Sequence, residues 1–196
     1  AKDYIDFKKD NFTVIHNAPI DVFYENSTKA LKRKKSNKIK IVTHHWSDNP
    51  KKGFDVYSAL GDLIQKHFKD KFKFTYIGRF NNNFKTSGID LKQPIDALSL
   101  SKELINHDIY LTASLEEAGA NHVLEAMACN LPILYRAGGG SINEYCLGMG
   151  EEYTSLNKEN LTSIIKKMMK KEYNAYNNNI KNVIEEYTKV INEVVG

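Results

Sequence analysis

The chain has 196 residues, of which 41% are hydrophobic, 27% charged and 11% aromatic. This composition is typical of a globular protein and excludes a disordered chain, and one hydrophobic core suffices at this length. No apolar run approaches the roughly 18 residues that a membrane-spanning helix needs, and the opening residues do not form a signal-peptide pattern. We therefore expect a cytoplasmic protein.

The net charge of +4 comes largely from two basic clusters, at residues 29–40 and 164–171. The first cluster has no interleaved aromatic residues, which a base-stacking groove requires, so we expect no nucleic-acid partner. A solvated linker and a solvated helix face explain the clusters, which are also compatible with peripheral association at the inner membrane face. Two cysteines, Cys129 and Cys146, are too few for a disulfide framework or a zinc site, and we expect buried thiols.

From residue 38 onward, short apolar runs that predict strands alternate with segments of helical periodicity. Strands are predicted at 38–43, 71–78, 89–93, 108–113 and 132–136. Helices are predicted after residue 53, from Pro94 and Asp96, over 121–129, and in apolar stripes that start at Leu161 and Ile180. The alternation predicts a Rossmann-like α/β fold with a doubly wound parallel sheet. We expect both C-terminal stripes to be packing faces.

The first 37 residues fit this alternation poorly. Residues 12–16 predict a strand, and residues 17–27 predict a turn and linker. Because a compact domain rarely starts with so long a lead, we interpret the chain as part of a larger protein.

Ligands of open α/β sheets bind beyond the carboxyl ends of the strands, where the first predicted loop covers residues 44–53. Lys52 and Gly53 open a helix there, which suits a phosphate, although a surface lysine beside a helix-starting glycine gives the same pattern. His44, His45 and Trp46 can pack in the core or stack on a ligand. No cluster of cysteines or carboxylates accompanies them, so we expect no metal.

The second loop, within residues 114–133, carries the strongest signal. Glu117 and Glu125 have an E-x7-E spacing, and Glu125 falls in an apolar helix where a carboxylate is costly unless it is satisfied. Sugar hydroxyls are suitable donors. Alternatively, Glu117 is solvated and Glu125 pairs with a buried lysine or arginine. Between the two glutamates, residues 118–122 offer small side chains and free N–H groups suited to a diphosphate.

The third loop, residues 136–146, contains a glycine run at 138–140. It matches neither the dinucleotide nor the P-loop fingerprint. Three glycines allow close backbone approach to a ligand, and a flexible turn is the alternative. The sequence also lacks G-x-S-x-G, which argues against a hydrolase, and Asp-x-Asp, which would hold a metal-bound sugar diphosphate.

These residues resemble the C-terminal, donor-binding half of GT-B glycosyltransferases, in particular the retaining glycosyltransferase family 4 (group 1, E-x7-E type). Residues 117–135 are similar to that family's E-P-F-G-x-x-x-x-E-A-M-A-C-G-L-P-V stretch, and residues 138–144 to its GG-x-x-E. Lys52-Gly53 resembles the end of its first phosphate loop. Residues 12–24 resemble V-I-x-N-G-V-D-x-x-x-F, which links its two domains.

The resemblance implies that residues 38–196 form a nucleotide-sugar-binding domain. Residues 1–37 would be the interdomain linker, or the end of an N-terminal acceptor-binding domain that is missing here. The resemblance implies no metal or cofactor in this domain. It assigns Glu125 to the donor ribose, and two catalytic roles: Glu117 beside the donor sugar and Lys52 at the diphosphate. The other donor-binding residues implied are Gly119, Ala120, Asn121, His122, Gly53, His45 and Trp46.

This chain departs from the family pattern at four places, one of which is Glu144, which comes one position late if Gly139 and Gly140 are the matched glycine pair. Trp46 stands where the family has an arginine, so either His44 or His45 supplies the charge or the diphosphate is held more weakly. Residues 118–120 replace Pro-Phe-Gly. Asn130 replaces a glycine, a mild change because asparagine tolerates positive φ.

The resemblance therefore implies transfer of a hexose-type sugar from a nucleoside diphosphate to a glycan or lipid-linked acceptor, as in polysaccharide biosynthesis. The domain alone would bind the donor but be incomplete for catalysis. Three alternatives stay open: a non-catalytic sugar-nucleotide-binding module, a GT-B sugar-nucleotide epimerase, and a basic α/β module that binds nucleic acid.

Overall fold

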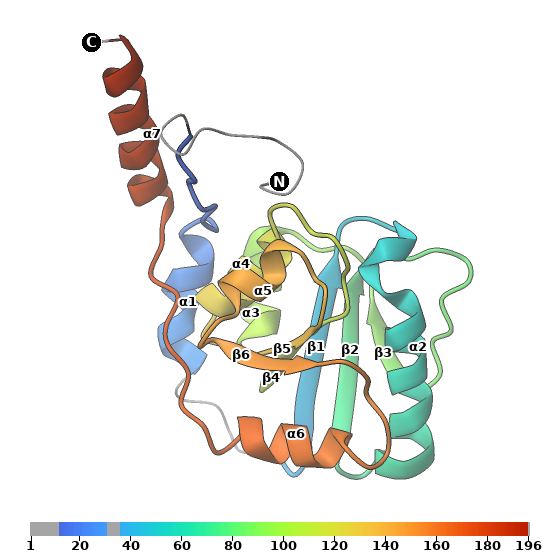
Figure 1. The fold of residues 1–196 in the computed structure, drawn as a ribbon. Coiled ribbons are helices and arrows are strands. Elements are labelled where there is room, and N and C mark those ends of the chain that lie inside the picture. The colour runs from blue at the N-terminus through green and yellow to red at the C-terminus, as the bar shows by residue number, and fades with distance from the viewer. Residues whose placement is uncertain (1–11, 31–35, 196) are drawn as a thin grey trace.

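The computed structural model describes residues 12–30 and 36–195 and contains a six-stranded parallel sheet (Figure 1). The strands lie in the order β3-β2-β1-β4-β5-β6, and every neighbouring pair is parallel. This is the strand order of doubly wound dinucleotide-binding folds, so the predicted fold class is confirmed. The strands are β1 Ile39–His45, β2 Phe72–Gly78, β3 Ile89–Lys92, β4 Ile109–Thr112, β5 Ile133–Arg136 and β6 Gly150–Tyr153.

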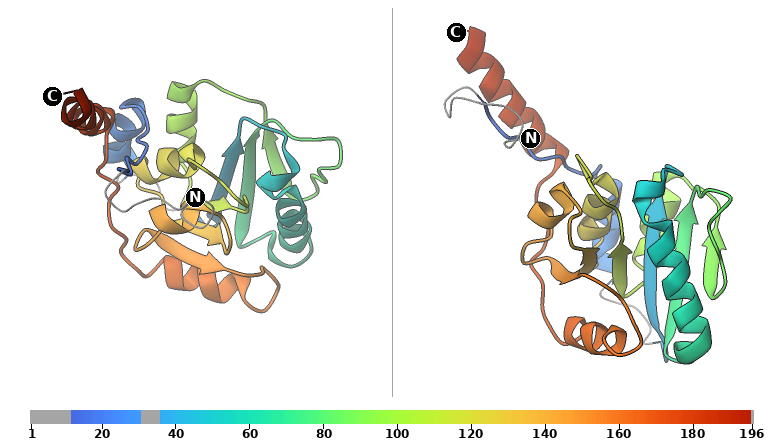
Figure 2. Two further views of the ribbon diagram at one scale, coloured as in Figure 1. Left: turned by 45° about the horizontal axis from the view of Figure 1, so that its top comes forward. Right: turned by 45° about the vertical axis from the view of Figure 1, so that its right-hand side comes forward.

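Helices cover both faces of the sheet (Figure 2). Helices α2 and α6 pack on one face, whereas α1, α3, α4 and α5 pack on the other. The helices are α1 Val22–Ala30, α2 Phe54–Leu63, α3 Ala97–Leu104, α4 Asn121–Ala128, α5 Ser141–Tyr145, α6 Leu161–Met168 and α7 Ile180–Val195. A π-helical turn, Ile64–Phe68, extends α2.

Successive residues of β1 serve opposite faces of the sheet. Ile41 packs in the core under α2 and α6, and Val42 packs in the core under α3 and α4. Because side chains alternate along a strand, His44 lies on the same face of the sheet as Val42, and His45 lies on the same face as Ile41. The last two residues of this strand therefore supply both faces of the sheet at its carboxyl end.

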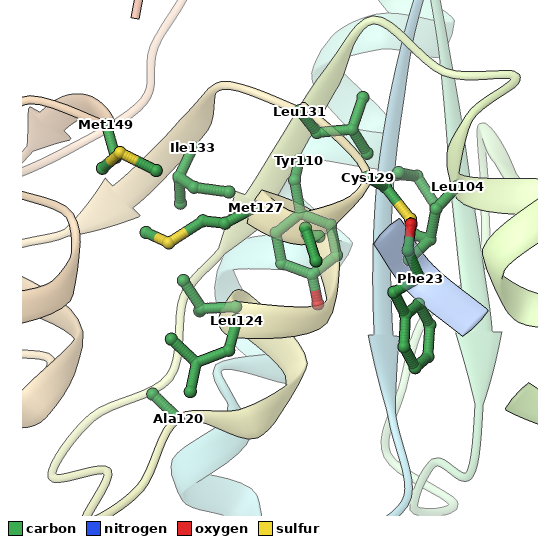
Figure 3. Close-up of a cluster of buried hydrophobic side chains, with 14 of the residues drawn as sticks. Phe23, Leu104, Tyr110, Ala120, Leu124, Met127, Cys129, Leu131, Ile133 and Met149 are labelled. Atoms are coloured by element: carbon green, nitrogen blue, oxygen red, sulfur yellow. The ribbon is translucent and has the colours of Figure 1, made fainter. Parts of the chain in front are cut away.

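The N-terminal segment differs from the prediction. Residues 12–16 form no strand, and the predicted turn and linker at 17–27 contains most of helix α1. Phe23 is buried between α1, α3 and α4, where Figure 3 shows it beside Leu104 and Cys129. One large buried apolar residue produces no hydrophobic periodicity in the sequence, and packing against the rest of the domain stabilises the helix. Part of the basic cluster at 29–40 lies outside the described residues.

Two further expectations need correction. Strand β6 was not predicted because its sequence, Gly-Glu-Glu-Tyr, has no apolar run; it pairs with β5 at the edge of the sheet. The stripe that starts at Leu161 is buried in α6, as predicted, whereas the stripe of α7 is not a packing face within the described chain. Ile184 and Ile191 of α7 are 59% and 58% exposed, and α7 extends away from the sheet (Figures 1 and 2).

The remaining composition-based expectations concern the cysteines and membranes. Cys129 and Cys146 are free and buried, as predicted. Within the described residues, no helix is both long and apolar enough to cross a bilayer.

Candidate functional site

Strand β1 continues two residues beyond its predicted end, so His44 and His45 belong to the strand and not to the following loop. Both side chains are buried. His45 Nε2 lies 2.8 Å from the Tyr57 hydroxyl of α2. On the opposite face, His44 Nε2 lies 2.7 Å from Glu125 Oε2 of α4. The buried lysine or arginine expected as the alternative partner of Glu125 is thus a histidine, His44.

The structure brings Lys52 and Glu117 together. Lys52 ends a 3₁₀ turn, Pro50–Lys52, after β1, and Glu117 lies in the loop after β4. The backbone N–H of Leu115 donates to the Lys51 carbonyl (2.9 Å), which joins the two loops. Lys52 Nζ lies 2.5 Å from Glu117 Oε1, with side chains that are 20% and 14% exposed. Glu117 is therefore not a solvated loop residue.

The glycine run 138–140 supports Glu117 directly. The Glu117 N–H donates to the Gly139 carbonyl (3.1 Å), and the Glu117 carbonyl accepts from the Ser141 N–H (2.9 Å). A Cβ on Gly140 would lie 2.6 Å from the Glu117 carbonyl oxygen. The close approach predicted for this run is therefore an approach to the Glu117 backbone.

The N-terminus of α4 presents unpaired backbone donors. Ala120 accepts from the N–H groups of Val123 and Leu124 (2.8 and 3.2 Å). Within the described chain, the N–H groups of Asn121 and His122 have no protein acceptor. Ala120 itself has the left-handed conformation (φ 42°), and such strain in a residue other than glycine is concentrated at functional sites. These donors can bind an anion.

Asn17 is a neighbour of the site that the sequence analysis did not select. Its side-chain N–H donates to Asn121 Oδ1 (3.2 Å), and a Cβ on Gly119 would lie 2.8 Å from the same nitrogen. Its carbonyl accepts from the Tyr176 hydroxyl (2.7 Å). The segment before α1 and the segment before α7 therefore meet beside the N-terminus of α4.

A cavity of about 240 Å³ joins most of the predicted residues. Gly53 does not line it: this glycine (φ 85°) packs against Ala113, where a Cβ would lie 2.5 Å from the Ala113 carbonyl. Glu125 does not line it either. The cavity is lined by His45, Trp46, Ser47, Lys52, Glu117, Gly119, Ala120, Asn121 and His122.

Trp46, which is 48% exposed, also borders a second, apolar depression. That depression is too tight in this structure to admit a water molecule. Trp46 and His45 therefore line both the polar cavity and the apolar depression. The depression is lined by His44, His45, Trp46, Ile77, Gly78, Pro94, Ile95 and Leu100.

The histidines of the cavity carry no charge at neutral pH. Burial lowers the pKa of His45 well below its usual value, and the nearby His122, His44 and Lys52 lower it further. Burial also lowers the pKa of His122 well below its usual value, with His44 and Lys52 adding to the effect. The compensating charge expected from His45 is therefore absent, and His44 is paired with Glu125. Lys52 is the one cationic side chain among the lining residues.

Metal ligands are not assembled in the described residues: no group of three or more His, Cys, Asp or Glu side chains is placed to hold an ion.

Neither a protein-family model nor a curated protein matches the sequence. Solved glycosyltransferases do match the structure. WaaG, a glycosyltransferase involved in lipopolysaccharide biosynthesis, has a TM-score of 0.62 and 15% identity over 87% of this chain and 50% of its own. Sucrose-phosphate synthase from Thermosynechococcus elongatus has a TM-score of 0.56 and 15% identity over 79% of this chain and 42% of its own.

A third match is the C-terminal domain of a group 1 family glycosyl transferase, LpcC, from Francisella tularensis. Its TM-score is 0.50, with 14% identity over 79% of this chain and 85% of its own. The chain therefore spans about half the length of WaaG and most of the LpcC domain. At such low identity the likeness establishes the fold: a Rossmann-like α/β domain of the kind found in GT-B glycosyltransferases.

Proposed function

We propose that this domain binds the nucleoside diphosphate sugar donor of a retaining glycosyltransferase. The observation that carries the proposal is the Lys52–Glu117 pair, which faces a cavity at the N-terminus of α4 and the carboxyl end of the sheet. Ligands of doubly wound sheets bind at this edge. A lone cation beside unpaired N–H groups suits a diphosphate, and an adjacent carboxylate suits sugar hydroxyls.

In this proposal the donor exchanges partners with the ion pair. The diphosphate takes Lys52 and the N–H groups of Asn121 and His122, which stabilise its charge as the leaving group departs. Glu117, released from Lys52, accepts from hydroxyls of the donor sugar near the reacting carbon. The backbone bonds from the glycine run hold Glu117 in place during this exchange.

The nucleoside end of the donor extends towards Trp46 and the apolar depression. The exposed indole, which borders the depression, offers a flat apolar surface for a base. Glu125 meets the ribose, because its side chain retains 19% exposure while one of its oxygens is held by His44.

The rest of the proposed enzyme is an N-terminal acceptor-binding domain, which would lie before the linker proposed at 1–37. The matched WaaG chain has about twice the length of the aligned region. The exposed apolar stripe on α7 and the meeting of segments 12–20 and 174–179 support a second domain on this side. We propose a hexose-type donor sugar and a glycan or lipid-linked acceptor, with no metal or cofactor in this half.

The experiment is a thermal-shift and calorimetry panel of UDP, GDP and ADP on this chain. A nucleotide at about 100 times its Kd adds roughly 2.7 kcal/mol of stability, which raises Tm by roughly 5–10 °C. Lys52→Ala should abolish the shift. Lys51→Ala is the matched control, because the neighbouring Lys51 is exposed and pairs with Glu116 outside the cavity. A wild-type chain without any shift, or a shift that survives Lys52→Ala, contradicts the proposal.

A second candidate, a non-catalytic sugar-nucleotide-binding module, is favoured by one observation. Trp46 and two neutral histidines leave Lys52 as the single cation lining the cavity, which is little charge to stabilise a departing diphosphate. Both candidates bind the nucleotide. Release of the nucleoside diphosphate from its sugar conjugate by the full-length protein supports the enzyme, and tight binding without turnover supports the module.

A further inference from the structure

His44 is a buried side chain with two hydrogen-bond partners from different elements. Its Nε2 contacts Glu125 Oε2 (2.7 Å), and its Nδ1 contacts the Tyr110 hydroxyl (3.2 Å). The Tyr110 ring packs edge-on against the imidazole, with centroids 5.5 Å apart. The imidazole therefore has both nitrogens and one face fixed by its surroundings.

The Glu125 carboxylate determines which atom of His44 donates the hydrogen bond between them. A carboxylate only accepts hydrogen bonds, so the Nε2 that faces Glu125 carries a proton. The Tyr110 oxygen accepts from the His44 backbone N–H (3.2 Å), and its hydroxyl lies within hydrogen-bond distance of His44 Nδ1 (3.2 Å) and of the His44 carbonyl (3.3 Å). Burial raises the pKa of Tyr110 well above its usual value and keeps this hydroxyl protonated. His44 Nε2 therefore donates to Glu125, and Tyr110 contacts the opposite ring nitrogen.

Glu125 is held by His44 at one oxygen. Its neighbours in α4, Leu124 and Ala126, are fully buried and apolar, whereas the Glu125 side chain is 19% exposed. Within the described residues, Oε1 has no protein donor. One oxygen is therefore anchored and the other is available to a ligand.

We propose that His44 is a positioning residue that orients the Glu125 carboxylate for the adjacent hydroxyls of a ribose. This rests on the proposed function, which places the ribose at Glu125. A carboxylate that is already fixed pays no ordering cost when the ligand binds, and a charge-assisted bond from an imidazole is strong enough to fix it. The contribution of His44 to the preference for the ligand hydroxyls therefore passes through Glu125.

The test compares UDP, GDP and ADP with their 2′,3′-dideoxy counterparts by calorimetry on this chain. The wild-type chain should prefer the hydroxylated form by about tenfold or more, as expected for buried bonds to a charged group. Glu125→Gln should remove most of this preference. His44→Phe should also remove it, and should have no further effect on the preference in a Glu125→Gln background.

A matched pair of variants keeps the test decisive if His44→Phe does not fold. The amide of His44→Gln reaches towards the Nε2 position and should restore the preference, whereas His44→Asn places its amide on the Tyr110 side and should not. Equal loss for both ligand forms, or an unchanged preference in His44→Phe and His44→Asn, overturns the positioning role. A wild-type chain that binds no diphosphate overturns the proposed function instead, and one that binds both forms equally overturns the ribose assignment.

Discussion

Acidification from about pH 7.5 to about pH 5.5 should destabilise this chain through its buried histidines. His45 and His122 have pKa values well below 6.5 in the folded chain, because burial disfavours their charged forms. The unfolded chain binds protons at these sites below about pH 6.5, whereas the folded chain does not. Stability is therefore complete above the unfolded pKa and is lost as the pH falls below it.

The magnitude follows from proton linkage. A histidine that stays neutral in the folded chain loses about 1.4 kcal/mol of stability at one pH unit below its unfolded pKa. His45 and His122 together contribute about 3 kcal/mol between these two pH values, and the lowered pKa of His107 acts in the same direction. For a domain of this size, 3 kcal/mol corresponds to a fall in Tm of roughly 6–12 °C.

The measurement is urea unfolding at several pH values for the wild type and for His122→Gln. Removing one titrating group should reduce the loss by about 1.4 kcal/mol, roughly half of the two-histidine effect. His67→Gln is the control, because His67 is exposed. An equal pH dependence in wild type and His122→Gln would refute the inference that His122 is neutral when folded.

Two pairs of substitutions test the packing that supports the site and the helices. Gly140→Ala should destabilise the chain by more than 1 kcal/mol and weaken UDP binding, because the added Cβ would meet the Glu117 carbonyl. Gly138→Ala has a similarly positive φ but open space around the added Cβ, so it should leave UDP binding intact. Urea unfolding measures the stability of both variants, and calorimetry measures their UDP affinity. Ile165→Ala in α6 should cost about 2–5 kcal/mol, whereas Ile184→Ala in α7 should stay within about 0.5 kcal/mol; a large loss in the second variant would mean that α7 is packed in solution.

The correctly predicted helices and strands are those whose apolar residues recur at regular spacing and are buried in the core. The strand at 71–78 and the helix after residue 53 have clear periodicity, and the structure places both against the core. Strand β6 escaped prediction because it is an edge strand whose glutamates face lysines and solvent: Glu151 pairs with Lys167 and Lys171. Helix α1 escaped because, among its described side chains, Phe23 is the one buried apolar residue and the other buried residue, Asn26, is polar.

The candidate site was predictable where it depends on chain topology. Loops after β1 and β4 must meet because parallel neighbouring strands end at the same edge, and Lys52 and Glu117 do meet there. The partner of Glu125 was not predictable in the same way. Thr43, His44 and His45 are polar and suggest the end of a strand, yet buried tyrosine hydroxyls from Tyr57 and Tyr110 satisfy them within the core. Tertiary hydrogen bonds of this kind leave no local pattern.

The two extra residues of β1 decide how the candidate site is divided. Because side chains alternate along a strand, His44 and His45 occupy opposite faces, so one strand end serves both α4 and α2. On the α4 face His44 anchors Glu125, and on the other face His45 lies beneath the cavity that contains Lys52. Trp46, the next residue, borders both depressions. In the proposed function, a donor that contacts both faces would therefore pass the strand end at Trp46, with its diphosphate on the Lys52 side and its nucleoside on the Glu125 side.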